Sequence, residues 1–468
     1  MKRIIYIFLG LAFLAVFSGC IEKTRKAKYV FYFIGDGMGI NQVLATGMYL
    51  AELEGQIGVH PLCFTNFPVR NHVSTYSRTN AVTCSAAAGT ALATGVKTQN
   101  GRIGMDVQKQ ALESIALKAK RAGRKVGITT SVGINHATPA VFYAHQPDRE
   151  MYYEIGTDAP KAGFDFYGGA GFKQVVSPKD SLLPDLYTLL RTSGYNVIDS
   201  KQDFSEMSRH CDKVIYVQPK DCKNPSSLPA VLDREQEDLT LSMITENAIQ
   251  FLSGQENEGF FLMVEGGIID WLCHANDGAG AIREIIDFSE TIQKAYDFYK
   301  KHPDETLIVV TADHETGGLA LGSGPYELHL KNLAYQKSSI IGLTQKLKQL
   351  RKQLGHQLSY QNIQELLHDE CGFGQDIILS ENEERELKDC FLESMKNMKL
   401  DKSEYALIDP VARVAVDIIN RKAMIHWASG GHSAGVVPVY AIGVGAEEFN
   451  EITDNTDIPK LIEKIAGY

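Results

Sequence analysis

The fold is indicated first by residues 29–39, which read YVFYFIGDGMG. The first six of these residues are apolar or aromatic, and a strand without polar alternation is typical of a parallel sheet that is covered on both faces. Similar runs occur at residues 126–132, 260–264 and 306–310, and helical patterns separate them. We therefore predict an α/β protein with a central, mostly parallel sheet and helices on both faces.

Polar residues follow each predicted strand at its carboxyl end. Asp36 stands between two glycines after the first run, and Asp313 follows the fourth run. Glu265 follows the third run, and Asn-His-Ala-Thr-Pro at residues 135–139 follows the second. The carboxyl ends of parallel strands meet at one edge of a sheet, where ligands bind. We therefore expect these segments to share one site.

The residue pattern changes between positions 319 and 428, where charged residues, glutamine and leucine recur at helical spacing. Helices are expected at residues 339–354 and 381–399. The segment 319–428 is predicted to be a mostly helical insertion, or a small second domain, within the α/β core. The core then consists of residues 21–318 and 429–468.

The first 20 residues have the pattern of an export signal. Lys2 and Arg3 precede an apolar run at residues 4–17, which is shorter than the roughly 20 residues of a membrane-spanning helix. The Ser-Gly-Cys that ends at Cys20 is similar to the box at which bacterial lipoproteins are lipidated, although Phe17 is unusual there. The prediction is a lipid-anchored protein of a bacterial cell envelope, periplasmic or on the outer membrane. A plain signal peptide or an N-terminal anchor is the alternative.

Charge and cysteine content narrow the possible environments. The formal net charge is −10, which argues against nucleic acid as a partner because such proteins usually present a basic face. Anionic substrates remain possible, since bound cations can invert the local field. Beyond Cys20 the number of cysteines is odd, so at least one thiol is free. Cys211 with Cys222, and Cys371 with Cys390, are the expected local pairs.

Several side chains of metal-ligand type fall at the predicted edge. Asp270 and His274 are four residues apart and would share one face of a helix. A carboxylate with an imidazole suits zinc, and a hard carboxylate such as Glu265 suits magnesium. Each element alone has an ordinary alternative, such as a surface ion pair, a structural turn or an exposed histidine. Together they favour a metal centre, which would be formed by Asp36, Glu265, Asp270, His274, Asp313, His314 and His432.

Ser85 is the candidate nucleophile. It lies in VTCSAAAGTA at residues 82–91, where small residues permit a tightly packed helix that begins near the serine. A helix N-terminus favours a phosphate, and a metal ion can activate the hydroxyl. The alternative is that Ser85 only caps the helix. Cys84 also lies at this helix start, but a sulfatase-type formylglycine needs Cys-x-Pro-x-Arg, and Ala86 and Ala88 stand at those places.

Taken together, these residues resemble the alkaline phosphatase family. The resemblance rests on short motifs in the family's order, which cover most of the chain outside the insertion. The matching motifs are IGDGMG at residues 34–39, VTCSAA at 82–87, ATGVKT at 93–98, HATP at 136–139, AH at 144–145 with Arg149, VEG at 264–266 with Asp270 and His274, TADH at 311–314, and His432.

The resemblance implies a role for each matched residue. It implies that Ser85 attacks a phosphate monoester in line, that a phosphoserine forms and is hydrolysed, and that Arg149 clasps two phosphate oxygens. It also implies a homodimer. The implied ligands are Asp270, His274 and His432 for a first zinc, Asp36, Asp313, His314 and Ser85 for a second zinc, and Asp36, Thr138 and Glu265 for one magnesium.

The chain departs from the family pattern in three places. Cys84 replaces an aspartate that often orients the arginine, so we expect a more mobile Arg149, weaker phosphate binding and faster product release. His136 and Trp271 stand where some members carry Asp and Lys, which leaves the identity of the third ion open. The insertion lies where family members place a crown or dimer loop, and we expect it to contribute dimer contacts or to shape the substrate entrance.

Two other functions are compatible with parts of this pattern. A phosphodiesterase or another phosphotransferase of the same fold would share the metal ligands, although the surroundings of Ser85 and the presence of Arg149 favour monoesters. An envelope lipoprotein with structural metals would need neither an activated serine nor an open coordination position. The sequence therefore favours a phosphomonoesterase.

Overall fold

The computed structural model describes residues 26–199, 204–219, 226–254, 259–322, 324 and 326–468. The export signal and lipid attachment predicted for residues 1–20 lie outside these described residues. Within the described part of the chain, no helix is both long and apolar enough to span a membrane.

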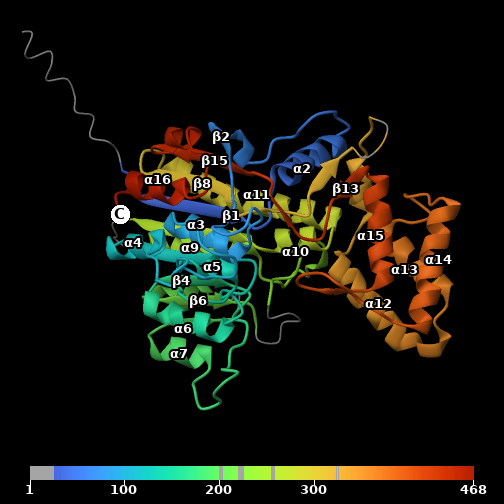
Figure 1. Cartoon of the computed structure of the whole chain (residues 1–468), viewed down its shortest axis with the longest axis horizontal. Coiled ribbons are helices and arrows are strands. Elements are labelled where there is room, and N and C mark those ends of the chain that lie inside the picture. The colour runs from blue at the N-terminus through green and yellow to red at the C-terminus, as the bar shows by residue number, and fades with distance from the viewer. Residues whose placement is uncertain (1–25, 200–203, 220–225, 255–258, 323, 325) are drawn as a thin grey trace, which may run out of the picture.

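A nine-stranded sheet in the order β2-β15-β8-β1-β7-β3-β4-β6-β5 forms the centre of the molecule (Figure 1). Of its described pairs, those made by β15 with β8 and β2 are antiparallel, and the others are parallel. The predicted α/β class with a mostly parallel sheet is therefore confirmed. The strands are β1 (Tyr29–Gly35), β2 (Val69–Val73), β3 (Lys125–Thr130), β4 (Phe166–Gly169), β5 (Asn196–Ile198), β6 (Val214–Val217), β7 (Phe260–Gly266), β8 (Thr306–Ala312) and β15 (Val437–Gly443).

Helices cover both faces of the sheet. One face packs against α9 (Leu241–Ser253) and α11 (Gly278–Lys301). The other packs against α3 (Ser85–Thr94), α4 (Ile115–Arg121), α5 (Ala137–Ala140) and α16 (Asp457–Ala466). The remaining helices of the core are α2 (Ile40–Leu53), α6 (Tyr152–Ala162), α7 (Leu186–Thr192), α8 (Phe204–Met207) and α10 (Ile268–His274).

The apolar run of β1 shows why both faces must be covered. Successive side chains of a strand point to opposite faces. Phe33 contacts Phe288 of α11, with ring centroids 5.9 Å apart. Its neighbour Tyr32 faces the other layer, where its hydroxyl donates to the Leu92 carbonyl of α3 (3.3 Å) and its ring meets Phe142 (6.0 Å). A strand with an exposed face would leave half of these rings in water.

The segment expected to be a helical insertion leaves the core through a two-stranded ribbon, β10 (Leu319–Leu321) with β13 (Ile425–Trp427). Between them the chain forms a lobe at the right of Figure 1. Its buried side chains belong to the same hydrophobic core as the sheet, so the lobe is packed onto the α/β core. The lobe contains α12 (Ile340–Leu354), α13 (Tyr360–Cys371), α14 (Glu381–Lys396), α15 (Pro410–Lys422) and a small hairpin of β11 (Asp401–Lys402) and β12 (Leu407–Ile408).

Local sequence explains where these helices begin. Ser339 caps α12 by accepting the N–H of Gly342. Ser380 and Glu383 form a capping box at the start of α14, in which each side chain bonds the backbone of the other. Helix α14 ends at Lys396, three residues before the expected end at residue 399.

The expected disulfide between Cys371 and Cys390 does not form, and both thiols are free. Tyr360, the first residue of α13, packs its ring 5.9 Å from that of Phe391, the neighbour of Cys390. Cys371 ends α13 and therefore lies about 16 Å further along that helix, at 1.5 Å per residue. A disulfide requires Cα atoms within about 7 Å. The other expected pair involves Cys222, which lies outside the described residues.

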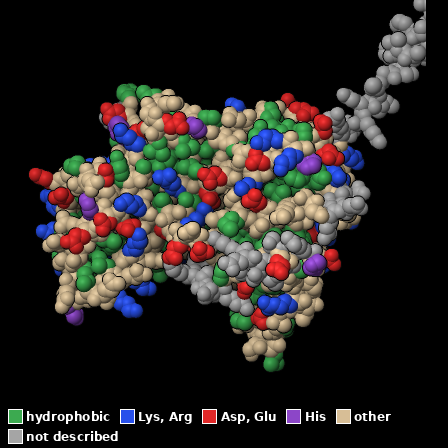
Figure 2. Space-filling view, turned by 180° about the vertical axis from the view of Figure 1, so that it is seen from behind, with side chains coloured by type: hydrophobic (Ala, Val, Ile, Leu, Met, Phe, Trp, Pro, Cys, Tyr) green, Lys and Arg blue, Asp and Glu red, His purple; other side chains and the backbone are tan. Residues whose placement is uncertain are grey.

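The surface opposite to the view of Figure 1 carries acidic and basic side chains that are interspersed (Figure 2). Among the described residues visible on this face, the basic side chains form no continuous surface.

Candidate active site

Acidic side chains meet where the central strands end. The parallel pairing of β1 with β7 and β8 continues to the last residue of each strand. Glu265 therefore lies near the end of β7, while Asp36 and Asp313 directly follow β1 and β8. The N–H of Gly37 donates to Asp313 Oδ1 (3.1 Å). A Cβ atom at Gly37, whose φ is +69°, would lie 2.8 Å from Asp270 Oδ1, so this close approach requires glycine.

Helix α10 adds Asp270 and His274, which lie on one face as their spacing predicts. His274 Nε2 is 3.4 Å from Asp270 Oδ2. The start of the helix is fixed from a neighbouring strand, because Ser131 Oγ accepts the N–H groups of Gly267 (2.9 Å) and Ile268 (3.2 Å). The pair of candidate ligands is thereby held against the sheet.

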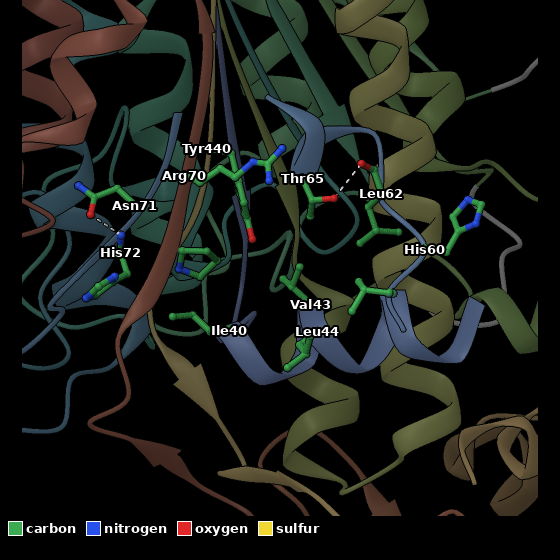
Figure 3. A pocket seen from close by; sticks show the side chains of 13 residues that line it. Ile40, Val43, Leu44, His60, Leu62, Thr65, Arg70, Asn71, His72 and Tyr440 are labelled. Atoms are coloured by element: carbon green, nitrogen blue, oxygen red, sulfur yellow. Dashed lines mark hydrogen bonds between the residues drawn. The ribbon is translucent and has the colours of Figure 1, made fainter. Parts of the chain in front are cut away.

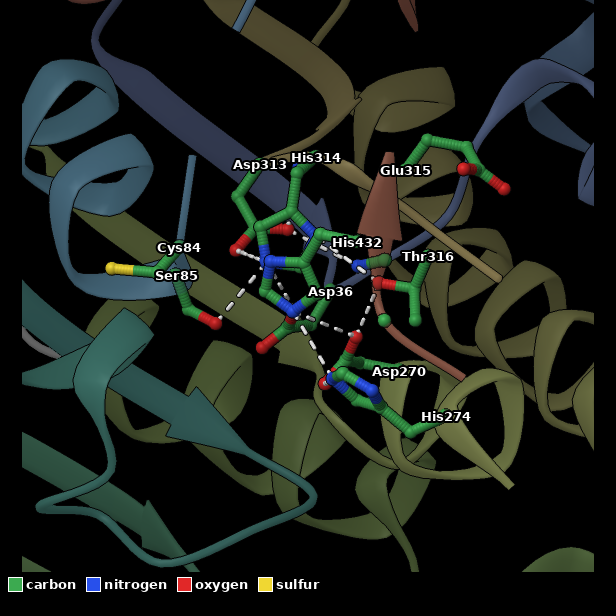
Figure 4. Close-up of polar contacts among 12 residues, drawn as sticks. Asp36, Cys84, Ser85, Asp270, His274, Asp313, His314, Glu315, Thr316 and His432 are labelled. Carbon is green, nitrogen blue, oxygen red and sulfur yellow. Dashed lines mark hydrogen bonds and ion pairs between the residues drawn. The ribbon is translucent and has the colours of Figure 1, made fainter. Parts of the chain in front are cut away.

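Two histidines present lone pairs to each other. His274 Nδ1 lies 2.7 Å from the Gly430 carbonyl, and His432 Nδ1 lies 2.9 Å from the Thr83 carbonyl. Because a carbonyl oxygen only accepts, Nδ1 carries the proton in both neutral rings and Nε2 carries the lone pair. The two Nε2 atoms face each other at 3.1 Å (Figure 4). Lone pairs at this distance repel each other unless a cation lies between them.

Thr316 connects a third histidine to the same site. Its Oγ1 donates to Asp270 Oδ1 (2.6 Å) and is therefore an acceptor for His314 Nδ1 (3.2 Å). His314 Nε2 is thus also the lone-pair nitrogen, and it lies 3.2 Å from Asp313 Oδ2 and 3.4 Å from Asp36 Oδ1. Sequence reasoning missed Thr316, since a threonine two positions after a candidate ligand carries no signal of its own.

The donor atoms form three groups within which they lie less than 4.8 Å apart. Each carboxylate in these groups is fully buried and has one oxygen without a hydrogen-bond partner: Asp36 Oδ1, Glu265 Oε1, Asp270 Oδ2 and Asp313 Oδ2. A buried carboxylate without a partner is costly, and a bound cation removes that cost. The residues therefore fit divalent cations, in groups formed by Asp270, His274 and His432, by Asp36, Asp313 and His314, and by Asp36, His136 and Glu265.

The pKa values of the acidic and imidazole side chains also indicate that this site binds cations. Burial raises the pKa of Glu265 to about 8 and that of Asp313 to about 7, and neighbouring carboxylates reinforce the rise. Burial, followed by repulsion from Asp313 and Asp270, raises the pKa of Asp36 well above its ordinary range. Burial lowers the pKa of His314 well below its ordinary value, so this ring stays neutral. Divalent cations would stabilise the ionised acids and bind the neutral imidazole.

Ser85 is the first residue of α3, and Cys84 occupies the N-cap position. The alternative that Ser85 merely caps this helix is therefore wrong. Ser85 is fully buried, and its Oγ lies 3.2 Å from His314 Nε2 (Figure 4). Cys84 Sγ accepts the N–H of Gly101 (3.1 Å). The hydroxyl of Ser85 thus faces the group formed by Asp36, Asp313 and His314, and it is not used to cap the helix.

The third group includes one residue more than the family resemblance implied. Thr138 Oγ1 donates to Asp36 Oδ2 (3.2 Å). His136, the N-cap of α5, is close enough to both acids to share an ion with them. Burial, followed by the charge of Arg149, lowers the pKa of His136 well below its ordinary value. A neutral imidazole has a single lone pair, which His136 can offer either to an ion or to Arg149 but not to both.

Arg149 lies beside this third group. Its Nη2 donates to His136 Nε2 (3.3 Å) and to Tyr405 Oη (3.1 Å). The ring of Tyr405 stacks on Trp271 with centroids 4.7 Å apart. Sequence reasoning missed Tyr405 because it lies in the insertion, far from every motif. These two acceptors contact Arg149 although position 84 has no carboxylate, and the mobility expected for Arg149 stays a prediction.

A separate cleft of about 350 Å³ lies between α2 and the strands β2 and β15 (Figure 3). Helix α2 lines it with Ile40, Val43 and Leu44, and the two strands line it with Arg70 and Tyr440. None of the predicted site residues lines this cleft. It is therefore not part of the candidate active site.

Known proteins resemble the chain over nearly its whole length. The family model for alkaline phosphatase matches residues 27–170 and 185–468. The chain is 31% identical to alkaline phosphatase 4 of Bacillus subtilis (strain 168), with 96% of this chain and 93% of that protein covered. It is 30% identical to alkaline phosphatase 3 of the same organism, with 99% and 96% covered.

Solved structures agree with these relatives. The cold-active alkaline phosphatase from a psychrophilic Shewanella sp. is 28% identical and superposes with a TM-score of 0.78, covering 94% of this chain and 99% of that one. The alkaline phosphatase from the Antarctic bacterium TAB5 is also 28% identical, with a TM-score of 0.66 and the same coverage. The resemblance inferred from the motifs is confirmed. The chain therefore belongs to the alkaline phosphatase family and is a phosphomonoester hydrolase.

Proposed function

We propose that the chain hydrolyses phosphate monoesters through a phosphoserine at Ser85, with two zinc ions and one magnesium ion as cofactors. One observation carries the proposal. Buried carboxylate oxygens without partners and three imidazole lone pairs converge beside the hydroxyl of Ser85. Such a set of metal-donor atoms needs cations, and bound cations would activate the neighbouring hydroxyl of Ser85 as a nucleophile.

The donor chemistry suggests which ion each group holds. Nitrogen and oxygen donors suit zinc, and oxygen donors suit magnesium. Two TAB5 structures with glutamate or aspartate in place of a histidine have magnesium in a site called M3, and we place His136 in a comparable site. The proposed ligands are Asp270, His274 and His432 for the first zinc, Asp36, Asp313, His314 and Ser85 for the second, and Asp36, Thr138 and Glu265 for magnesium, with His136 beside it.

In the proposed reaction, each residue of the site has a separate role. When bound, the cations supply Lewis-acid stabilisation to the Ser85 alkoxide and to the leaving oxygen. The contact of Ser85 Oγ with His314 Nε2 places the hydroxyl beside the proposed ligands of the second zinc, and the N-terminus of α3 favours the anionic phosphoryl group. Arg149 holds two phosphoryl oxygens through its planar guanidinium. Ser85 Oγ forms a bond to phosphorus as the alcohol leaves, and water then cleaves the phosphoserine to phosphate and free Ser85.

Ser85→Ala tests this proposal directly. The variant should lose acid-stable labelling by radioactive substrate, and its turnover of an aryl phosphate should fall by about a thousandfold or more because no covalent intermediate can form. Ser253→Ala, which removes an exposed hydroxyl from α9 that donates to the Ile249 carbonyl, is the control. Wild-type turnover in purified Ser85→Ala protein would refute the proposal.

Two further assays address the cofactors and the competing function. Chelation should abolish turnover, and zinc with magnesium should restore it. The rate on an aryl monoester should exceed the rate on the matching diester, because Arg149 and the cations together would bind three non-bridging oxygens, and a diester has only two. A faster diester reaction would favour the phosphodiesterase alternative.

We also propose that the protein is lipidated at Cys20, resides in a bacterial cell envelope and forms a homodimer. The residues before Cys20 support lipidation, and Cys20→Ser should then release the protein from membranes. We expect the insertion to contribute the dimer contacts, and sedimentation should give twice the mass of one chain. A soluble wild type or a monomer at micromolar concentration would contradict the respective proposal.

A further inference from the structure

The hairpin of β11 and β12 reaches the active site from the helical insertion. The Ser403 N–H donates to the Ala406 carbonyl (2.9 Å), which closes a two-residue turn with Tyr405 at its tip. The phenol ring of Tyr405 stacks on Trp271, with 14° between the ring planes. Tyr405 therefore belongs to the insertion, and its aromatic contact with Trp271 holds its ring in the candidate active site.

The hairpin is held on both sides. Arg413 of α15 donates to the Ala275 carbonyl just after α10, and its Nε lies 3.6 Å from Asp401 at the start of the hairpin. After the hairpin, Asp409 forms an ion pair with Arg351 of α12 (3.2 Å). The tip is thus fixed relative to α10, the helix that carries Asp270 and His274.

The hydroxyl of Tyr405 holds Arg149 from one side. Nη2 of Arg149 has two N–H bonds, and these go to Tyr405 Oη (3.1 Å) and His136 Nε2 (3.3 Å). Nε and Nη1 are left for an anion. Among the described residues no carboxylate forms an ion pair with Arg149, so both of its side-chain acceptors are neutral. The guanidinium is thus oriented by neutral acceptors and not by an ion pair.

We infer that Tyr405 is a positioning residue for Arg149, and that the insertion thereby sets the affinity of the active site for phosphate. The inference rests on the proposed function, because that proposal gives Arg149 the phosphoryl oxygens. Tyr405 fixes which edge of the guanidinium faces the phosphate, and bidentate binding depends on that orientation. Cys84 lies nearby, since Gly101 donates its N–H to the Cys84 thiol and accepts the Arg149 N–H through its carbonyl (2.8 Å).

Calorimetric titration of the metal-loaded protein with inorganic phosphate tests the inference without turnover. Tyr405→Phe keeps the stack on Trp271 and removes only the acceptor for Arg149. Phosphate should bind about tenfold more weakly, the size of one lost hydrogen bond to a charged group. Tyr360→Phe is the matched control, because it removes another hydroxyl of the insertion, which donates to the Glu384 carbonyl (3.2 Å). Its phosphate affinity should equal that of the wild type.

A second substitution separates positioning from a general structural effect. Cys84→Asp places a carboxylate near Arg149 and should restore most of the affinity lost in Tyr405→Phe. In the wild-type background it should change affinity less than about twofold, because Tyr405 already orients the arginine. Equal effects of Cys84→Asp in both backgrounds, or wild-type affinity in Tyr405→Phe, would overturn the inference.

Kinetics on an aryl phosphate distinguish this inference from the proposed function. Tyr405→Phe should raise KM more than it lowers kcat, because the residue acts on binding of the phosphoryl group. Absence of hydrolysis by the wild type would contradict the proposed function. Unchanged phosphate affinity in Tyr405→Phe would contradict only the positioning role.

Discussion

His136 is the residue whose side chain bears most directly on which ion the third group of donors would hold. Its imidazole lies with the carboxylates of Asp36 and Glu265 in the third group of donors, and its low pKa keeps it neutral. A neutral imidazole suits zinc and related ions, whereas magnesium prefers oxygen donors. His136 Nε2 directs its one lone pair at Arg149, so an aspartate at this position would add an oxygen donor, and we expect the identity of residue 136 to affect how tightly the third site holds magnesium.

We expect His136→Asp to shift the third site towards magnesium. During dialysis against a magnesium-free buffer that contains zinc, the variant should lose its magnesium more slowly than the wild type, as measured by elemental analysis. His145→Asp is a control, because His145 bonds the Leu112 carbonyl and belongs to none of the three groups. Loss of magnesium at the wild-type rate in His136→Asp would exclude His136 from the third site.

At the scale of elements, the junction of β3 and α10 positions two of the proposed metal ligands. Ser131→Ala should leave the N–H groups of Gly267 and Ile268 without their acceptor. We expect a loss of about 1–3 kcal/mol in the free energy of unfolding, together with faster loss of metal to a chelator, because Asp270 sits in the first turn of α10. Denaturant unfolding and metal release measure the two effects.

Ser193→Ala provides the comparison for this prediction. Ser193 is exposed and donates to the Leu189 carbonyl, so its removal should change stability by less than about 0.5 kcal/mol. If Ser131→Ala released metal no faster than Ser193→Ala, the junction would not hold the ligands in place.

The strands and their terminal acids could be predicted because their signals are local. The run at residues 29–34 has the length and apolarity of a covered strand, and Asp36 follows it between glycines. The contacts that orient the histidines could not be predicted in this way. His432 is fixed by the carbonyl of Thr83, 349 positions away, and any residue type supplies a carbonyl. Tyr405 left no signal either, since only the docking of the insertion brings it to the site.

At the scale of the whole molecule, the insertion and the α/β core act as one folded unit. Asn420 of α15 donates to the Asn276 carbonyl (2.8 Å), and Gln336 donates to Asp277, the N-cap of α11 (2.8 Å). The insertion therefore forms hydrogen bonds with the segment between α10 and α11. A change that loosens the insertion should also disturb His274, which ends α10.

A buried acid outside the active site couples the stability of this unit to pH. Burial raises the pKa of Glu284 to about 8 from an ordinary 4.5. Arg234 opposes the rise, while Asp287 and Asp233 add to it, and the Val231 N–H donates to Glu284 Oε1 (2.6 Å). Between these two pKa values the folded state keeps a proton that the unfolded state loses. The contribution of Glu284 to the free energy of unfolding is therefore greatest below pH 4.5. It decreases as the pH rises towards 8.

We expect the Tm of the metal-loaded wild type to decrease between about pH 6 and about pH 8.5. The Tm of Glu284→Gln should decrease less, because the amide still accepts the Val231 N–H and carries no charge. Chelated protein should show a steeper fall, since Glu265 and Asp313 have pKa values of about 8 and about 7 without cations. Glu290→Gln, an exposed change on the same helix, should follow the wild type. Scanning calorimetry would contradict this account if Glu284→Gln lost stability as steeply as the wild type.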